Sequence, residues 1–481
     1  MRWTDKHVSV VGLGKSNLAL IRFLVRRGVS VTARDRKTAD ELGPALQELQ
    51  LLGVDLRLGP RYLKGLSSSD GIFLTPGMRK DFPEILAAKA DGVEITSETN
   101  LFFELCRAPI IGITGSSGKT TTTTLVGALL EAVGHKVYVG GNIGRPLIEH
   151  VDEIKESAVV VLELSSFQLE LATRSPQIAA VTNITPNHLD VHGSMESYID
   201  AKRHIYDFQC ESDVLVLNHA DRHTRSMAKS ARGRVVWFSS QGEVPTGAFI
   251  DRGRIVIAKD GRTGRSLTDV CGLDEVLLLG DHNVENVLAS CAISDQLGVP
   301  PGAMRDVVST FTGVAHRLEL VREANGVAYY NDSIATSPSR AVAGIRSFDR
   351  PIHLIAGGYD KRLPFDEFAR TVVERVKTLI LIGEAGPAIH RAVMEAGGGA
   401  KPKIISAGSL EEAVSLARES AVSGDVVLLS PACASYDMFP NFEVRGEQFR
   451  KWVRAFTESS ECDSNSARDE TRVGISFDDA Q

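Results

Sequence analysis

The stretch with the clearest chemical meaning is G-I-T-G-S-S-G-K-T, residues 112–120, which follows an apolar run and precedes T-T-T-T-L-V-G-A-L-L. This order predicts a strand, a glycine loop and a helix, whose backbone N–H groups and dipole can hold phosphates. Lys119 can then reach the terminal phosphates, and the Thr120 hydroxyl can bind Mg²⁺. The strict motif has a glycine where this chain has Ile113. Because strand, loop and helix agree, the pattern favours a mononucleotide site over a chance glycine turn.

A carboxylate follows the next strongly apolar run, A-V-V-V-L-E-L, in which Glu163 comes at the end of the predicted strand. A carboxylate there loses hydration unless it meets a cation or hydrogen-bond donors, and a metal ion beside the phosphate loop would supply one. A surface position at the strand's end explains the residue equally well. Both interpretations stay open.

A third cluster lies in N-I-T-P-N-H-L-D-V-H-G-S-M-E-S-Y-I-D-A-K-R-H-I-Y, residues 183–206, with His188, Asp190 and His192 just beyond a predicted strand. Zinc is a poor match, because no cysteine takes part and the histidines lack a third ligand at helical spacing. Ser194 is a plausible N-cap for a helix that carries Lys202. A lysine on such a helix is normally solvated.

The chain begins with another glycine stretch, V-V-G-L-G-K-S-N, which half-matches the dinucleotide fingerprint because Asn17 stands at the third glycine. A strand over 8–11 and a helix over 18–27 are predicted around it. Asp35 ends the following strand, where a carboxylate could accept a hydrogen bond from a ribose hydroxyl. Any diphosphate could bind such a turn, and a purely structural strand-to-helix turn is the alternative.

The elements that must position these residues alternate between strand and helix along most of the chain. The pattern predicts an α/β protein with parallel, doubly wound sheets in three domains. We expect a Rossmann-like N-terminal domain over 1–97, a central P-loop domain over 98–313 and a Rossmann-like C-terminal domain over 314–457. Residues 458–481 are polar without apolar periodicity, which predicts a disordered acidic tail.

The composition is that of an ordinary globular protein, with 481 residues, 43% hydrophobic and 24% charged. The net charge of −7 comes mostly from the tail, so we expect no basic face and no nucleic-acid partner. No signal peptide and no apolar run of membrane-spanning length is recognisable. Six scattered cysteines without C-x-x-C fit a reducing cytoplasm. We expect a cytoplasmic protein that binds no membrane and is a monomer.

Several further blocks occur in a fixed order along the chain: L-E-L-S-S-F-Q-L-E, N-H-L-D, A-K-R-H-I-Y, G-D-H-N-V-E-N, A-H-R-L-E and N-D-S-I-A-T-S. Together with the glycine loop, this set resembles the Mur ligases, ATP-dependent amide-forming enzymes of peptidoglycan precursor synthesis. The resemblance covers about residues 8–456. L-S-P-A-C-A-S-Y-D-M-F-P-N-F-E-V-R-G, 429–446, resembles the glutamate-adding members, and the D-N-P-R box of the diaminopimelate or lysine adders is absent.

The resemblance implies roles for residues at matching positions. Those for ATP are Gly115, Ser116, Ser117, Gly118, Lys119, Thr120, Thr121, Asn283, Asn286, Arg317 and Asp332. Those for two Mg²⁺ ions are Thr120, Glu163, His188 and Lys202. Lys202 would be carbamylated by CO₂, which replaces an ammonium that repels Mg²⁺ by a carboxylate. Lys119, His188 and Lys202 would be the catalytic residues.

The resemblance also implies two substrate sites. The UDP-sugar residues would be Lys15, Ser16, Asn17, Asp35, Arg36, Gly77 and Asn142. The residues for the incoming glutamate would be Thr336, Lys361, Ser435 and Phe442, with Lys361 pairing one carboxylate. One departure is Ile334, where this family often has a lysine.

The implied reaction joins D-glutamate to UDP-N-acetylmuramoyl-L-alanine. ATP phosphorylates the substrate carboxylate, and the glutamate amine attacks the resulting acyl phosphate. Alternatives are a related Mur ligase, a ligase that adds glutamate to folates, or the same reaction with L-glutamate. A nucleotide-gated binding protein and an NAD-dependent oxidoreductase built on the first glycine loop are further alternatives from other classes.

Overall fold

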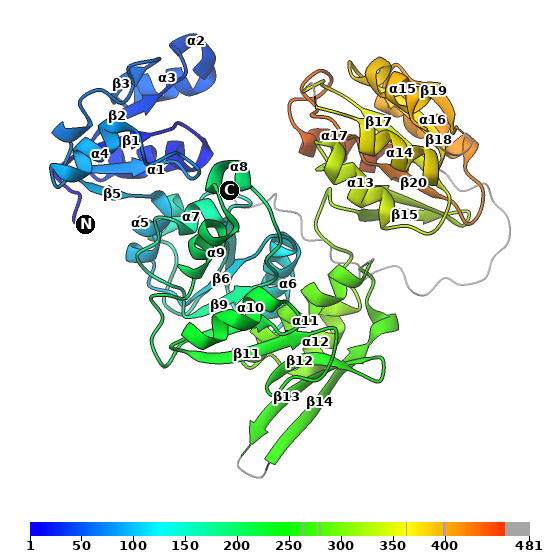
Figure 1. Cartoon of the computed structure of the whole chain (residues 1–481), viewed down its shortest axis with the longest axis horizontal. Coiled ribbons are helices and arrows are strands. Elements are labelled where there is room, and N and C mark those ends of the chain that lie inside the picture. Colours follow the sequence, from blue (N-terminus) through cyan, green and yellow to red (C-terminus); the bar gives the residue numbers. More distant parts are fainter. Residues whose placement is uncertain (262–263, 279, 362, 398–400, 457–481) are drawn as a thin grey trace. The chain divides into compact units, whose positions relative to one another are not determined.

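The computed structural model describes residues 1–261, 264–278, 280–361, 363–397 and 401–456. The expected acidic tail lies outside these residues. The chain forms two compact units, the first made of residues 1–276 with 281–309 and the second of residues 277–280 with 310 onward. Figure 1 shows the elements of each unit.

The first unit contains a five-stranded sheet in which every neighbouring pair is parallel. Its spatial order is β3-β2-β1-β4-β5. The strands are β1 His7–Val11, β2 Ser30–Asp35, β3 Asp55–Leu58, β4 Gly71–Leu74 and β5 Glu94–Thr96. Parallel strands end at the same edge, so the loops after β1 and β4 meet. A Cβ on Gly12, whose φ is +85°, would lie 2.5 Å from Thr75 Cγ2, and this close approach requires glycine.

The first unit also contains a nine-stranded sheet of order β14-β13-β12-β11-β10-β9-β6-β8-β7. Its strands are β6 Ile110–Thr114, β7 Val137–Gly141, β8 Val159–Glu163, β9 Ile178–Val181, β10 Val214–Asn218, β11 Arg234–Ser239, β12 Gly247–Asp251, β13 Arg254–Gly261 and β14 Gly264–Gly272. Among the described residues of this sheet, the antiparallel pairs are β12–β13 and β13–β14. Figure 1 shows them as a projecting two-stranded ribbon, which the prediction of a purely parallel sheet did not include.

Helices connect these strands and cover the sheets. In chain order they are α1 Lys15–Arg26, α2 Ala39–Leu42, α3 Pro44–Leu51, α4 Pro83–Ala90, α5 Glu98–Leu105, α6 Lys119–Glu131, α7 Ser166–Leu169, α8 Leu189–His192, α9 Met195–Arg203, α10 Arg222–Met227, α11 Asp281–Asp295 and α12 Pro301–Val308. Across the described parts of both units, no helix combines the length and apolarity needed to cross a membrane.

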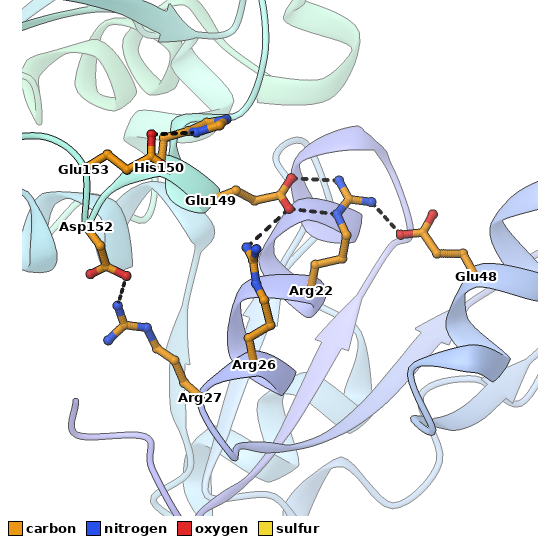
Figure 2. A network of polar contacts seen from close by, with 8 residues as sticks. All are labelled: Arg22, Arg26, Arg27, Glu48, Glu149, His150, Asp152 and Glu153. Atoms are coloured by element: carbon orange, nitrogen blue, oxygen red, sulfur yellow. Dashed lines mark hydrogen bonds and ion pairs between the residues drawn. The ribbon is translucent and has the colours of Figure 1, made fainter. Parts of the chain in front are cut away.

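The two sheets of the first unit share one apolar core. Leu20 and Phe73 from the five-stranded side belong to the same buried cluster as Ile110 and Leu162 from the nine-stranded side. Polar contacts add to this junction where α1 faces the 3₁₀ helix η2, Leu147–His150. Figure 2 shows Arg22 of α1 paired with Glu149 of η2, and Arg27, the C-cap of α1, paired with Asp152 of the following turn.

The second unit is a six-stranded sheet of order β15-β16-β20-β17-β18-β19, parallel except for the β15–β16 pair. Its strands are β15 Glu319–Ala324, β16 Val327–Asn331, β17 Ile352–Gly357, β18 Val376–Ile382, β19 Lys403–Ser406 and β20 Val426–Leu429. Its helices are α13 Pro338–Arg346, α14 Asp366–Arg375, α15 Gly386–Glu395, α16 Leu410–Ser420 and α17 Phe442–Arg454.

Helices cover both faces of this six-stranded sheet, as expected for a doubly wound fold. Successive strand residues point to opposite faces. Accordingly, Leu354 of β17 packs in the cluster that holds residues of α13, α14 and α15, whereas Ile355 packs in the cluster of α16 and α17. The loops that follow β16, β17 and β20 all leave the sheet at its carboxyl edge, where ligand-binding residues are expected in such folds.

Candidate active site

The phosphate loop between β6 and α6 has a conformation that only glycine permits at two positions. Gly115 has a φ of +149°, and a Cβ there would lie 1.9 Å from Thr182 Oγ1. Gly118, the N-cap of α6, has a φ of +79°, and its Cβ would lie 2.1 Å from Asn286 Oδ1. The predicted strand, loop and helix are confirmed, and the helix N-terminus provides N–H groups for an anion.

The segment that follows β9 braces this loop from the side. The Ser116 N–H donates to the Asn183 carbonyl at 2.9 Å, and the Ser117 N–H donates to Asn183 Oδ1 at 3.0 Å. The Thr182 hydroxyl donates to the Ser117 carbonyl at 2.6 Å. These bonds hold the loop through its backbone and the two serines.

Lys119 and Thr120, which follow the loop, direct their polar groups toward the loop and toward Glu163. Lys119 Nζ donates to the carbonyls of Gly115 at 3.0 Å and Ser116 at 3.3 Å, so its charge lies directly over the loop. The Thr120 hydroxyl donates to Glu163 Oε2 at 2.7 Å. A phosphate on the loop would therefore meet a cation and a neighbouring pair of oxygen ligands. Thr121, next along the helix, is buried.

Glu163 lies at the end of β8 and is only 2% exposed, so the surface interpretation of this carboxylate is wrong. Its second oxygen accepts a hydrogen bond from Asn142 Nδ2 at 2.8 Å. Asn142, which was expected at the UDP-sugar site, therefore also orients Glu163. A hydroxyl and a carboxylate beside a phosphate loop form the oxygen donor set that Mg²⁺ prefers.

Lys202 on α9 is 1% exposed, so the expectation of a solvated helix lysine is wrong. Its Nζ donates to the Gly115 carbonyl at 2.9 Å and to Thr114 Oγ1 at 3.3 Å, and lies 4.7 Å from the centre of the Tyr198 ring. Burial and the charge of Lys119 lower the pKa of Lys202 well below its usual value, although Glu163 opposes this. The lowered pKa favours the neutral amine, the form that can react with CO₂.

The histidine segment forms the short helix α8. His188 is its N-cap, is exposed and has a φ of +53°, which is unusual for a residue with a side chain. His192 at the other end has a buried side chain, 1% exposed, next to Glu170. The side chain of Asp190 lies outside the described part. Across that part, no group of three or more His, Cys, Asp or Glu side chains is arranged so that it could hold a metal ion.

Two asparagines expected at the ATP site lie beside the phosphate loop. Asn286 on α11 is 4% exposed, and its Nδ2 donates to Asn283 Oδ1 at 2.9 Å. Its Oδ1 accepts from the Thr122 hydroxyl at 3.5 Å, which ties α11 to α6. The first unit thus brings together the phosphate loop, both asparagines, Glu163 and Lys202.

Asn17 and Asp35 both form hydrogen bonds with the backbone of the first glycine loop. Asn17 is 1% exposed, and its Nδ2 donates to the carbonyls of Val11 at 3.1 Å and Gly12 at 2.8 Å. Asp35 is 8% exposed and accepts from the Leu13 N–H at 2.7 Å. Both side chains shape the loop, so a ligand there would be held mainly by backbone groups and by residues beyond them.

The remaining residues expected at the UDP-sugar site lie around this loop. Lys15 Nζ donates to the Gly144 carbonyl at 3.1 Å, and Ser16 lines a small cleft with residues of the nine-stranded half, including Gly141. Gly77 has a φ of +79° and lies against the Phe167 ring. Arg36 is exposed directly after β2.

In the second unit, the expected ATP residues lie where β15 and β16 meet. Asp332 accepts from Ser430 Oγ at 2.8 Å and from the Leu318 N–H at 3.3 Å, and burial raises its pKa to about 7. Arg317 lies between His316, with φ +64°, and Leu318, with φ +43°. Two non-glycine residues with positive φ, one on each side of the same arginine, indicate backbone strain, and such strain is concentrated at functional sites.

The expected glutamate residues also lie in the second unit. Lys361 Nζ donates to the Thr336 carbonyl at 3.3 Å, so these two positions are adjacent. Ser435 is 2% exposed, and the Phe442 carbonyl accepts from the Ser333 hydroxyl at 2.8 Å. Ile334, where the family often has lysine, has Arg340 of α13 donating to its carbonyl at 3.3 Å.

Sequence reasoning missed Arg445, which is 1% exposed on α17. It donates to Ser333 Oγ at 3.0 Å and to the carbonyls of Ser333 at 2.8 Å and of Cys433 and Ala434 at 3.2 Å. Burial lowers its pKa to about 10, which still leaves it charged at neutral pH. Arg445 therefore ties together the segments that carry Thr336, Ser435 and Phe442. The R-G pair within the 429–446 block was the only signal for it.

Family models match three consecutive stretches. They are described as the Mur ligase MurD-like N-terminal domain over residues 6–97, the Mur ligase middle domain over 113–294 and the Mur ligase glutamate ligase domain over 316–433.

Curated relatives match over nearly their whole length. A UDP-N-acetylmuramoylalanine–D-glutamate ligase from Symbiobacterium thermophilum is 54% identical over 94% of this chain and 99% of its own. An enzyme of the same name from Acetivibrio thermocellus is 47% identical over 94% of this chain and 97% of its own.

Solved structures show the same fold at much lower identity. A UDP-N-acetylmuramate-alanine ligase from Thermotoga maritima aligns over 94% of this chain and 99% of its own, with a TM-score of 0.55 and 19% identity. A MurF ligase from T. maritima, solved in complex with ADP, aligns over 94% and 96% with a TM-score of 0.52 and 18% identity.

Proposed function

Because the chain belongs to the Mur ligase family, we propose that it is the ATP-dependent ligase that joins D-glutamate to UDP-N-acetylmuramoyl-L-alanine. The observation that carries this is the 54% identity, over nearly the full length of both chains, to a ligase of that name. The braced phosphate loop with Lys119, and the buried Glu163 and Lys202 beside it, support the ATP-dependent part of the reaction.

The reaction begins at the phosphate loop. The γ-phosphoryl group of ATP passes to the alanine carboxylate of the nucleotide sugar, which gives an acyl phosphate and ADP. The amine of D-glutamate then attacks the acyl carbon, an amide bond forms and inorganic phosphate leaves. Lys119, the loop N–H groups and the N-terminus of α6 neutralise charge during the first step, so positioning and electrostatics supply most of the catalysis.

Magnesium fits the residues that lie beside the loop. Thr120 and Glu163 would hold one ion, and His188 with a modified Lys202 would serve a second. Bound there, the ions supply positive charge against the phosphate oxygens. This chain's own part is to keep Glu163 buried and oriented through Thr120 and Asn142, so that its carboxylate needs no rearrangement.

Lys202 is proposed to carry a carbamate. The lone pair of its neutral amine attacks CO₂, one N–H proton passes to water, and a carboxylate remains on the side chain. The burial of Lys202 and its lowered pKa support this step. Incubation with ¹³C-bicarbonate should give a protein-bound carbamate resonance that is missing in Lys202→Ala. The same resonance in the variant would place the modification elsewhere.

The substrate sites form part of the same proposal. The nucleotide sugar would lie against Lys15, Ser16, Asn17, Asp35, Arg36, Gly77 and Asn142. D-Glutamate would lie against Thr336, Lys361, Ser435 and Phe442. The purine, ribose and terminal phosphate of ATP would also meet Asn283, Asn286, Arg317 and Asp332. We place the domain limits near residues 97 and 313 and propose a cytoplasmic monomer.

The test is phosphate release from ATP in the presence of UDP-N-acetylmuramoyl-L-alanine, with D-glutamate, L-glutamate and meso-diaminopimelate in parallel. D-Glutamate should stimulate release strongly, and omission of the nucleotide sugar or the change Lys119→Ala should abolish it. Equal or greater stimulation by either other amino acid would overturn the assignment of the amino acid. Stimulation by a folate in place of the nucleotide sugar would favour the folate ligase instead.

A further inference from the structure

The loop that follows β4 reaches the nine-stranded half of the first unit at two places. Gly77 lies against the Phe167 ring, where a Cβ would come within 3.6 Å. Lys80 forms an ion pair with Glu170, whose side chain is 23% exposed. Its neighbour Arg79 instead pairs with Asp81 inside the same loop, and both of these side chains are mostly exposed. Of the neighbours Arg79 and Lys80, it is therefore Lys80 that links this loop to the nine-stranded half of the unit.

Glu170, which pairs with Lys80, also contacts His192. The imidazole Nδ1 lies 3.1 Å from Glu170 Oε1, and Nε2 lies 3.0 Å from Ser166 Oγ. A carboxylate can only accept, so Nδ1 carries the proton and Nε2 accepts from the serine hydroxyl. Both ring nitrogens are thus engaged and the ring is buried, which excludes His192 as a base and leaves it a positioning role.

The His192 ring anchors the helix that begins with His188. It stacks on Phe167 with ring centres 4.9 Å apart and planes 4° apart, and it meets the edge of Tyr198 at 5.2 Å. The same Phe167 ring lies 5.2 Å from the His188 ring. Tyr198 in turn contacts Ser116 of the phosphate loop and lies under Lys202. A continuous set of contacts therefore runs from the 77–80 loop to the phosphate loop.

We propose that Lys80, Glu170 and His192 are positioning residues that couple the nucleotide-sugar loop to the segment of His188 and to the phosphate loop. This rests on the proposed function, which assigns Gly77 to the nucleotide sugar and His188 to the ATP site. A nucleotide sugar that orders residues 77–80 fixes Lys80, and Lys80 fixes Glu170 and the His192 ring. Because such coupling is reciprocal, each ligand strengthens the binding of the other by the same factor.

The test measures binding rather than turnover. Calorimetry gives the dissociation constant of a Mg²⁺-bound ATP analogue with a non-transferable γ-phosphate, with and without UDP-N-acetylmuramoyl-L-alanine. We expect the nucleotide sugar to tighten this binding about 5-fold or more in the unmodified protein. Lys80→Met should reduce the factor to about 1, whereas the matched control Arg79→Met should keep the original value and Lys80→Arg should restore most of it.

Two further variants protect the test against a folding defect. Glu170→Gln keeps the size of the side chain and removes its charge, and His192→Gln keeps a polar group without the ring. Both should lose the coupling factor while the analogue alone binds within about 2-fold of its original affinity. Coupling that persists in Lys80→Met and Glu170→Gln, or that is absent from the unmodified protein, overturns the inference while the ligase activity stands. Failure of the unmodified protein to bind the nucleotide sugar overturns the proposed function itself.

Discussion

Two buried basic side chains, one taken from each unit, differ in their hydrogen bonds and in their charge. Lys202 in the first unit and Arg445 in the second are both 1% exposed. Lys202 donates to two oxygens, and burial together with the charge of Lys119 lowers its pKa well below the usual value. Arg445 donates to four oxygens of three residues and keeps a pKa of about 10. Burial lowers the pKa of both groups, but the guanidinium of Arg445 starts from a higher pKa and stays charged at neutral pH. The Lys202 amine is instead favoured in its neutral form, which can react.

The largest expected effect is on turnover, when Lys202 of the first unit is replaced by arginine, the residue type that is buried at position 445 of the second unit. Lys202→Arg places a guanidinium, which stays protonated and forms no carbamate, against Gly115. We expect kcat for glutamate-dependent phosphate release to fall by about 100-fold or more. Lys89→Arg, at an exposed position of α4, is the control and should keep normal turnover. A Lys202→Arg enzyme with near-normal kcat would show that no carbamate is needed.

The two cations should also differ in what they contribute to stability. Arg445→Met leaves the carbonyls of Ser333 and Cys433 buried without their donor, so we expect the free energy of unfolding to fall by about 3 kcal/mol. Lys202→Met removes a poorly bonded cation and should change it by less than about 1 kcal/mol. Urea denaturation of both variants measures the difference. Equal losses would mean that the number of hydrogen bonds does not separate the two sites.

Local sequence patterns predicted some features of these two sites but not the burial of Lys202 and Arg445. The strand, loop and helix around Lys119 and the position of Glu163 at a strand end were predictable, because both follow from local apolar patterns. The burial of Lys202 and Arg445 was not, because it depends on distant partners: Thr114 is 88 positions from Lys202, and Ser333 is 112 from Arg445. The β13–β14 ribbon was also missed: residues 255–258 of β13 form a short buried apolar run, but most of β14 is exposed and lacks such a run.

A buried anion in the second unit extends the comparison. Asp425 is 3% exposed, and although burial raises its pKa, Lys377 at 2.8 Å and His353 at 2.9 Å bring it down to about 2. A pKa below the unfolded value near 4 means that the stabilisation is present above pH 4 and is lost as pH falls toward 2. The free energy of unfolding should fall by about 2 kcal/mol when this contribution of Asp425 is lost.

Denaturation of the protein and of Asp425→Asn at pH 6 and pH 3 tests this sign. The variant should be less stable than the unmodified protein at pH 6, and the gap should narrow at pH 3, where the aspartate begins to take up a proton. A gap that is constant with pH would mean that the contribution of Asp425 does not depend on its charge.

The smallest effects are expected at the exposed ion pairs of Figure 2, where water already solvates the charges. Arg27 pairs with Asp152, whose side chain is 69% exposed, whereas Glu149, 21% exposed, accepts from both Arg22 and Arg26. Asp152→Asn should change the free energy of unfolding by less than about 0.5 kcal/mol, and Glu149→Gln by about 1 kcal/mol. Both changes should shrink in 0.5 M salt, measured by urea denaturation at two salt concentrations, whereas the loss in Arg445→Met should not, since salt screens only the exposed charges. An Asp152→Asn loss as large as that of Arg445→Met would remove the distinction between buried and solvated cations.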